Sequence, residues 1–431
     1  MYFTISKDMV IVDGAKYSAC IDFRNSQIFR LNSSARKIIR LGQRKLTIAE
    51  AAERLKHRFD ASEVTSFITE LKEKGILELT ESPSPNAKAK KTSLSLNMLW
   101  IEVTPECNLR CIHCYAAAEN RKKQTDNLST DEIKQVLDEA SQLGCHDVQF
   151  TGGEATLRSD LKELIEYTRS KNINVEVFTN GTNLNEPWLQ FFSEKHVQVA
   201  MSIYSHRAET HDKITGIPGS FERSINSLKL LIAHRVPVRA ATVAMKTNED
   251  ELEETIRFLS NLGAKLRLPD PVRPTGRGKG LNHWPEKYGR KYLQTKPAFI
   301  IDRNLYERNR QWNSCWYGKA AITSQGDVLP CVFARNQIVG NIRKQKLSTI
   351  IRSTVLLSLW HLTKDKIEGC KDCEYRYVCE DCRPWATGLT DNLCAKSPRC
   401  TYDPYTGEWV NAHDPMDPHL KFTGNATNDT C

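Results

Sequence analysis

Three cysteines set close together are the first residues in this chain whose spacing indicates chemistry. Cys107, Cys111 and Cys114 are separated by three and two residues, and they follow the apolar run Leu99–Val103. Thiolates spaced this closely form a ligand set for a soft metal, but they leave one position of a four-ligand site unfilled. Structural zinc normally takes four protein ligands, whereas a [4Fe–4S] cluster held by three thiolates keeps one iron open. The spacing therefore favours an iron–sulfur cluster over zinc or unligated thiols.

Composition limits the classes of protein that this chain can belong to. It has 431 residues, a net charge of +9 and 14 cysteines, most of which follow residue 300. We expect a cytoplasmic protein without a membrane span, because no long apolar run and no signal-peptide pattern are present. In a reducing compartment, clustered cysteines indicate metal binding rather than disulfides. We expect no nucleic-acid partner, because the basic residues are dispersed and no aromatic stacking pattern accompanies them.

Residues 1–80 predict a small winged-helix-like domain, with three strands followed by three helices. Asn32 is a helix cap, Gly42 is expected to end that helix, and Thr47 with Glu50 forms a capping box at the next helix. The strands are expected near 9–12, 18–23 and 27–31. Such a sheet has an exposed edge that can accept a peptide as an added strand. The alternative is that this domain only stabilises the rest of the chain.

A strand–helix unit repeats six times after the polar linker 81–96. Alternating strands and helices predict an α/β fold with a parallel sheet, and six units predict a partial (β/α)6 TIM-like barrel. Ligands bind such folds at the carboxyl ends of the strands, where the three cysteines fall. The expected strands are Met98–Val103, Asp147–Thr151, Asn174–Thr179, Val197–Ser202, Val236–Met245 and Ala264–Leu268.

The second of these strands ends in Gly152, Gly153 and Glu154. Glycines at a strand end allow backbone to approach a ligand closely, and the carboxylate can accept hydrogen bonds from an ammonium group. An ordinary turn before a helix explains the same three residues equally well.

The three-cysteine loop, the Gly-Gly-Glu segment and the six strand–helix units together resemble the radical S-adenosylmethionine (SAM) superfamily. The resemblance implies that Cys107, Cys111 and Cys114 hold a [4Fe–4S] cluster whose open iron chelates SAM. It also implies that Gly152, Gly153 and Glu154 hold the methionine ammonium group. Two further strand ends, at Asn180 and Ser202, are expected to reach the ribose and carboxylate of the cofactor. Relatives commonly have an acid and a glycine where this chain has Tyr204 and Ser205.

The C-terminal cysteines contain two Cys-x2-Cys pairs that, by themselves, would suit a zinc ribbon. The whole array instead resembles the SPASM extension of radical SAM enzymes, which carries two auxiliary [4Fe–4S] clusters. The resemblance implies three [4Fe–4S] clusters in all. It assigns the first auxiliary cluster to Cys315, Cys331 and Cys382, and the second to Cys370, Cys373, Cys379 and Cys400. The fourth ligand of the first auxiliary cluster stays open: Cys394, a thiolate of the substrate, or none.

Residues 1–80 resemble the PqqD-like domain that binds leader peptides of ribosomally made natural products. The resemblance implies a precursor peptide as partner and an electron donor such as flavodoxin or ferredoxin. The expected domains are 1–80 for peptide recognition, 81–96 as linker, 97–300 as partial barrel and 301–431 as auxiliary-cluster domain.

These expectations converge on a radical SAM peptide maturase that forms a thioether between a cysteine sulfur and carbon. Carbon–carbon cross-linking is the alternative within the same class. A zinc-dependent peptide- or nucleic-acid-binding protein and an activating enzyme for a folded protein are alternatives from other classes.

Overall fold

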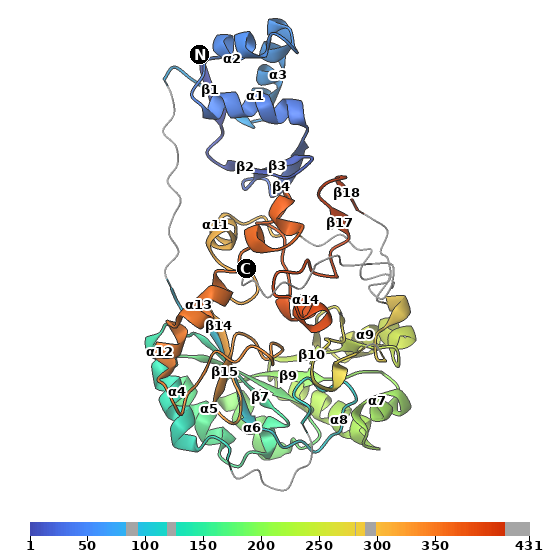
Figure 1. Ribbon diagram of the computed structural model, residues 1–431. Coiled ribbons are helices and arrows are strands. Elements are labelled where there is room, and N and C mark those ends of the chain that lie inside the picture. The colour runs from blue at the N-terminus through green and yellow to red at the C-terminus, as the bar shows by residue number, and fades with distance from the viewer. Residues whose placement is uncertain (83–93, 119–125, 281, 289–298, 410–431) are drawn as a thin grey trace.

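The computed structural model describes residues 1–82, 94–118, 126–280, 282–288 and 299–409. Most of the linker expected at 81–96 and the end of the expected 301–431 domain lie outside the described residues. Figure 1 shows the N-terminal domain at one end, the central sheet with its helices at the other, and the C-terminal region between them. Within the described residues, no helix combines the length and the apolar character needed to span a membrane.

The N-terminal domain has the predicted order of three strands and three helices. The strands form an antiparallel sheet in the order β2-β3-β4, so that β2 and β4 are its edges. A second antiparallel pair, β1 with β5, joins the first and the last segment of the domain. This pair was not predicted. The elements are β1 (Tyr2–Ile5), β2 (Met9–Asp13), β3 (Ser18–Asp22), β4 (Gln27–Leu31), α1 (Ser33–Gln43), α2 (Ile48–Leu55), α3 (Ala61–Glu73) and β5 (Leu77–Thr80).

The predicted caps of this domain are confirmed except at one position. The Asn32 side chain accepts from the backbone of Ala35, and the Thr47 capping box is present. The prediction that Gly42 ends α1 is wrong, because the helix continues to Gln43. A Cβ atom at Gly42 would lie 2.6 Å from the ring and carbonyl of Phe3. The glycine is therefore required by the close packing of β1 on α1, not by a helix end.

The central sheet contains the six predicted parallel strands and forms the predicted partial barrel. Neighbouring strands from β6 to β10 pair in parallel in chain order, and β12 pairs with β10. The strand expected over 236–245 is divided, because its second half leaves the sheet and pairs with a later segment. The strands are β6 (Met98–Thr104), β7 (Asp147–Gly152), β8 (Asn174–Thr179), β9 (Gln198–Ser202), β10 (Val238–Ala241), β11 (Val243–Ala244), β12 (Lys265–Leu266) and β13 (Asp270–Pro271).

Amphipathic helices cover the outside of this sheet (Figure 1). The predicted capping box of Ser129 and Glu132 opens the first of them. Their buried faces pack with the strands into one apolar core. These elements are α4 (Thr130–Gln142), η1 (Ala155–Leu157), α5 (Leu161–Ser170), α6 (Glu186–Glu194), α7 (Ala208–Thr215), α8 (Ser220–Ala233), η2 (Glu249–Glu251), α9 (Leu252–Asn261) and η3 (Gly276–Gly278).

The C-terminal region extends the central sheet past residue 300. Strand β14 pairs in parallel with β6, on the side opposite β7, and β15 and β16 follow it antiparallel. This extension was not predicted. The remaining elements are α11 (Arg303–Gln311), β14 (Lys319–Ile322), β15 (Asp327–Leu329), β16 (Gly340–Asn341), α12 (Leu347–Ile351), α13 (Thr354–Trp360), η4 (Lys364–Lys366), η5 (Cys370–Asp372), α14 (Arg383–Thr390), β17 (Tyr402–Asp403) and β18 (Glu408–Trp409).

The N-terminal sheet packs directly on the C-terminal region. Side chains alternate along β3, so that Cys20 faces the core of its own domain while Ile21 packs with Tyr306 and Val378. The Arg376 guanidinium also donates to the backbone carbonyl of Asp13 at 2.7 Å. The predicted peptide-binding domain is therefore joined to the cysteine-rich region by an apolar interface.

Candidate active site

The first three cysteines lie together in the loop that follows β6. Burial raises the pKa of Cys107 and of Cys111 to about 12, and the thiols are electrostatic neighbours of one another. Backbone N–H groups of Leu109 and Ala118 point at the sulfurs of Cys107 and Cys114, both at 3.4 Å. Metal coordination removes the thiol protons, and N–H groups directed at sulfur are a feature of iron–sulfur sites. The donor set therefore fits a cluster.

The two glycines after β7 are required by the cysteine loop itself. A Cβ atom at Gly152 would lie 2.3 Å from the carbonyl oxygen of Thr104, and one at Gly153 would lie 2.0 Å from that of Glu106. Gly153 also donates its N–H to the Thr104 carbonyl at 2.8 Å, and Glu154 donates to the Glu106 carbonyl at 2.7 Å. The chain that leads into Cys107 occupies the space beside these glycines.

The Glu154 carboxylate is buried, with 1% of the residue exposed. Its Oε1 accepts from the N–H and hydroxyl of Thr156, at 3.1 and 2.6 Å, and from the hydroxyl of Thr179 at 2.6 Å. Its Oε2 accepts from the N–H of Asn180 at 2.7 Å. Burial raises the pKa of Glu154, and these hydrogen bonds oppose the rise. A carboxylate has about four acceptor positions, so Oε2 retains capacity for an ammonium group.

The side chain of Asn180 contacts the cysteine loop directly, and Ser202 is connected to it through Tyr204. Asn180 donates its amide to Asn108 at 2.9 Å, within the loop between Cys107 and Cys111. Ser202, at the end of β9, is hydrogen-bonded to Tyr204. The structure therefore brings Glu154, Asn180 and Ser202 to the same edge of the sheet as the three cysteines.

Tyr204, which replaces the acid common in relatives, faces the cysteine loop. Its hydroxyl is hydrogen-bonded to the Cys111 thiol, and its ring meets the ring of His113 edge-on at 4.7 Å. Burial lowers the pKa of His113 to about 3, so its imidazole is neutral. Ser205 points elsewhere, with its hydroxyl bonded to Glu251 of η2.

The C-terminal cysteines separate into two groups. Cys315 donates a hydrogen bond to Cys382 and lowers the pKa of Cys382 to about 7, and Cys331 is a neighbour of both. Burial raises the pKa of Cys331 to about 11. A zinc ribbon would combine Cys382 with Cys379, whereas here Cys382 joins the two upstream cysteines.

The second group contains Cys370, Cys373, Cys379 and Cys400. Each of the first three has Cys400 as an electrostatic neighbour, and burial raises the pKa of each. The N–H of Tyr375 points at the Cys373 sulfur at 3.4 Å. In the described part of the chain, no three Cys, His, Asp or Glu side chains meet the geometry of a site for a single metal ion.

Cys394 is buried and disulfide-bonded in the structure, so the expectation that its thiol could be the fourth ligand of the first auxiliary cluster is wrong. The guanidinium of Arg383 donates to the carbonyls on either side of Cys394, those of Leu393 and Ala395, at 2.9 and 2.8 Å. The backbone of Arg383 is also hydrogen-bonded to Cys315. Cys20 and Cys145 are buried as well, the former within the N-terminal core.

Several residues that position this site had no recognisable signal in the sequence. Arg277, which follows β13, donates to the carbonyls of Cys111 and Ala118 at 2.8 and 2.9 Å. A charged residue inside the apolar strand β6, Glu102, pairs with Arg335 at 2.6 Å. Glu102 is also hydrogen-bonded to Tyr115, the residue after the last cysteine of the loop. These contacts join the cysteine loop to segments more than 150 positions away in the sequence.

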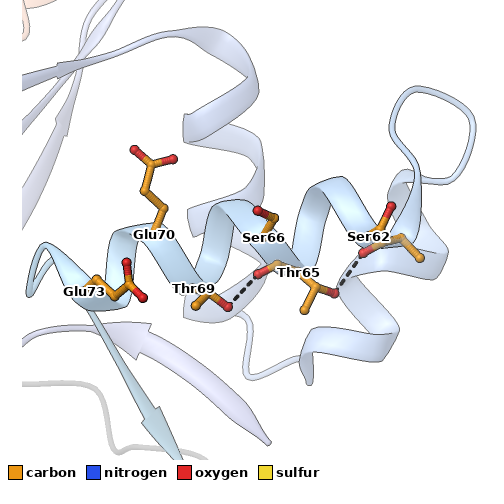
Figure 2. Close-up of a pocket in the computed structure, with 7 residues that line it drawn as sticks. Ser62, Thr65, Ser66, Thr69, Glu70 and Glu73 are labelled. Carbon is orange, nitrogen blue, oxygen red and sulfur yellow. Dashed lines mark hydrogen bonds between the residues drawn. The ribbon is translucent and has the colours of Figure 1, made fainter.

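A shallow groove lies on α3 of the N-terminal domain, far from these cysteines along the chain. Figure 2 shows its lining of serine, threonine and glutamate side chains. The hydroxyls of Thr65 and Thr69 are bonded to carbonyls of their own helix. We regard this groove as the solvated face of α3.

Three family models match the chain. Residues 101–259 match the radical SAM superfamily, 315–374 match the SPASM iron–sulfur cluster-binding domain, and 9–77 match coenzyme PQQ synthesis protein D. The fold and the site thus define a radical SAM iron–sulfur protein. Within that superfamily, the chain belongs to the group with a C-terminal SPASM domain and an N-terminal PqqD-like domain.

Individual relatives match a large part of this chain. AdoMet-dependent heme synthase of Methanosarcina barkeri is 28% identical over 335 residues, which cover 70% of this chain and 95% of that protein. The subtilosin biosynthesis protein AlbA of Bacillus subtilis is 29% identical over 317 residues, covering 70% of each chain. The structure of Streptococcus suis SuiB bound to S-adenosylmethionine has a TM-score of 0.54 and 18% identity, and the match covers 91% of this chain and 99% of SuiB.

Replacing Gly153 by alanine tests how the cysteine loop is positioned. The added Cβ would collide with the Glu106 carbonyl, so Gly153→Ala should displace the loop and remove about four iron atoms from the reconstituted protein. The measurement is iron per chain, with circular dichroism to follow the fold. Gly144→Ala is the control for backbone strain without a collision, because its φ of +84° disfavours a side chain but its Cβ meets no atom within 4 Å. Equal iron in both variants would show that this close approach does not position the site.

Proposed function

We propose that this protein modifies a ribosomally made precursor peptide and joins a cysteine sulfur of that peptide to carbon. The observation that carries the proposal is the separation of Cys315, Cys331 and Cys382 from the four-thiol group. The names of relatives support a peptide substrate. AlbA is a biosynthesis protein for the antilisterial bacteriocin subtilosin, and SuiB has been solved with its precursor peptide SuiA.

In this proposal Cys107, Cys111 and Cys114 hold a [4Fe–4S] cluster that supplies one electron to SAM and so generates a 5′-deoxyadenosyl radical. Oε2 of Glu154 accepts the methionine ammonium group, which explains a buried carboxylate with acceptor capacity left. Ser202 and Asn180 lie at the ends of neighbouring strands, where they would contact the ribose and the carboxylate of SAM. The half-buried ring of His113 and the buried ring of Tyr204 pack edge-on beside the cluster loop and would limit the access of water to it.

The C-terminal groups hold the two auxiliary clusters, which makes three in total. Cys315, Cys331 and Cys382 provide three ligands to the first, which leaves one coordination position for a sulfur of the peptide. The Arg273 guanidinium lies beside Cys382 and Cys331 and provides positive charge for anionic sulfur. Cys394, the other fourth ligand that the sequence left open, is disulfide-bonded in the structure and offers no thiol to this cluster.

The atoms and electrons of thioether formation balance when SAM is the oxidant. One peptide C–H bond and one S–H bond break, and one C–S bond forms. The C–H hydrogen leaves in 5′-deoxyadenosine, methionine is released, and the thiol proton goes to solvent. The electron that cleaves SAM is returned when the C–S bond forms, so the peptide loses two hydrogens per link. A flavodoxin or ferredoxin of the cytoplasm would supply the first electron.

The N-terminal domain would bind the leader of the precursor through the edge strand β4 (Gln27–Leu31). An added strand forms backbone hydrogen bonds with an edge of this kind. One face of the same sheet, including Ile21 of β3 and Ile28 of β4, packs on the C-terminal region at Val378. A leader bound at β4 would therefore be held at a fixed position relative to the cysteine-rich region.

Reaction with the precursor peptide tests the bond that is formed. Incubation with SAM and reductant should lower the peptide mass by two hydrogens per link and remove one alkylatable thiol per link. Mass spectrometry before and after iodoacetamide treatment measures both changes. A loss of two hydrogens with every thiol still alkylated would indicate carbon–carbon cross-linking, and an unchanged mass would contradict the proposal.

Hydrogen exchange tests the peptide-binding edge. The full-length precursor should slow backbone exchange in Gln27–Leu31, because an added strand gives these amides new hydrogen bonds. The groove on α3, at Thr65 and Thr69, is the internal control and should exchange at its original rate. A leaderless peptide is the second control. Protection of α3 in place of β4 would place the leader elsewhere.

A further inference from the structure

A buried lysine lies against the second group of C-terminal cysteines. Lys364 is the first residue of η4 and is 7% exposed. Its Nζ donates to the backbone carbonyl of Cys379. Lys364 and the cysteines 370, 379 and 400 line one cavity of about 890 Å³. The amine and the thiols therefore face the same space.

Lys364 shares its buried acidic neighbour with a second buried cation. Asp381 is its acidic neighbour, but Asp381 is already paired at 2.5 Å with Arg383, whose side chain is fully buried. One carboxylate thus lies between two buried cations. On another wall of the cavity, Asp250 pairs with Lys287 at 2.8 Å. Other acids of the lining, among them Glu253, Glu254 and Glu380, are exposed, so Lys364 and Arg383 share the single buried carboxylate of Asp381. Buried charges are normally paired, and an anion held by the cysteines would complete this pairing.

A thiolate-ligated iron–sulfur cluster is the anion that the neighbouring ligands imply. Four thiolates outweigh the charge of the metal core, and each reduction adds one further negative charge. The net charge around a cluster is one of the factors that set its reduction potential. An ammonium group at this position stabilises the reduced form more than the oxidised form.

We propose that Lys364 is the countercharge of the second auxiliary cluster and raises its reduction potential. This inference rests on the proposed assignment of Cys370, Cys373, Cys379 and Cys400 as the ligands of that cluster. Lys364 acts on the cluster only through the positive charge of its ammonium group and takes no part in bond formation. Even with the neighbouring thiols uncoordinated, the pKa of Lys364 is about 12: burial lowers it, while Cys379 and Asp381 raise it.

Three variants of the full-length reconstituted protein test this role. Lys364→Gln removes the charge but keeps a donor for the Cys379 carbonyl, and Lys364→Arg keeps the charge. Lys366→Gln is the matched control, because Lys366 belongs to the same turn and is exposed. Potentiometric titration followed by electron paramagnetic resonance gives the potential, and iron analysis gives the cluster content.

We expect Lys364→Gln to lower the equilibrium constant for reduction of the second auxiliary cluster at least tenfold. For a one-electron couple, this is a shift of the reduction potential by about 59 mV to a more negative value. Lys364→Arg and Lys366→Gln should titrate like the original protein. Loss of the cluster in Lys364→Gln alone, with the original potential kept in Lys364→Arg, also supports a requirement for charge.

Other outcomes overturn the inference. They are an unchanged potential in Lys364→Gln, an equal shift in Lys364→Gln and Lys364→Arg, and loss of the cluster from both. If the unsubstituted protein holds no cluster at these four cysteines, the proposed ligand assignment fails, and the inference fails with it. If Lys364→Gln keeps its full iron content and its reduction potential is unchanged, the inference about Lys364 fails while the proposed ligand assignment stands.

Discussion

The close approach of two backbone segments is the constraint on which the site depends. The chain after β7 packs against the chain after β6 so tightly that neither Gly152 nor Gly153 has room for a side chain. Hydrogen bonds from Gly153 and Glu154 to the carbonyls of Thr104 and Glu106 fix this contact. As a result, the segment that carries the three cysteines is held against the segment that carries the buried carboxylate. Positions of cluster ligands and cofactor contacts are thus set by backbone rather than by flexible side chains.

The C-terminal cysteines depend on a different physical factor, the balance of buried charge. Arg273 lies beside Cys382 and Cys331, and Lys364 lies beside Cys379 and Cys370. Buried cations are costly unless anions accompany them. Arg273 is paired with Asp270 at 2.9 Å, Lys364 has Asp381 as its acidic neighbour, and the proposed clusters would add negative charge beside both cations. The two groups are joined through the short segment Cys379–Cys382, which contributes one cysteine to each. In this arrangement the two adjacent Cys-x2-Cys pairs of the sequence do not converge on a single four-thiol site.

Much of the fold could be predicted from the sequence, because periodicity and capping are local properties. The six parallel strands and the capping boxes at Thr47 and Ser129 were predicted correctly. Strand β14 was missed, since its pairing with β6 joins residues more than 200 positions apart. The pairing of Arg335 with Glu102 and the burial of Lys364 were missed for the same reason. At the site, the cysteine spacing indicated the chemistry, but the reason for the glycines became visible only in three dimensions.

The central claim is that the cysteines form three separate cluster sites. The most direct test is the iron and acid-labile sulfide content of the anaerobically reconstituted protein, compared with a variant in which Cys107, Cys111 and Cys114 are alanine. The account predicts about twelve irons per chain in the first and about eight in the second. About four irons in the original protein, with zinc bound by the C-terminal cysteines, would contradict it.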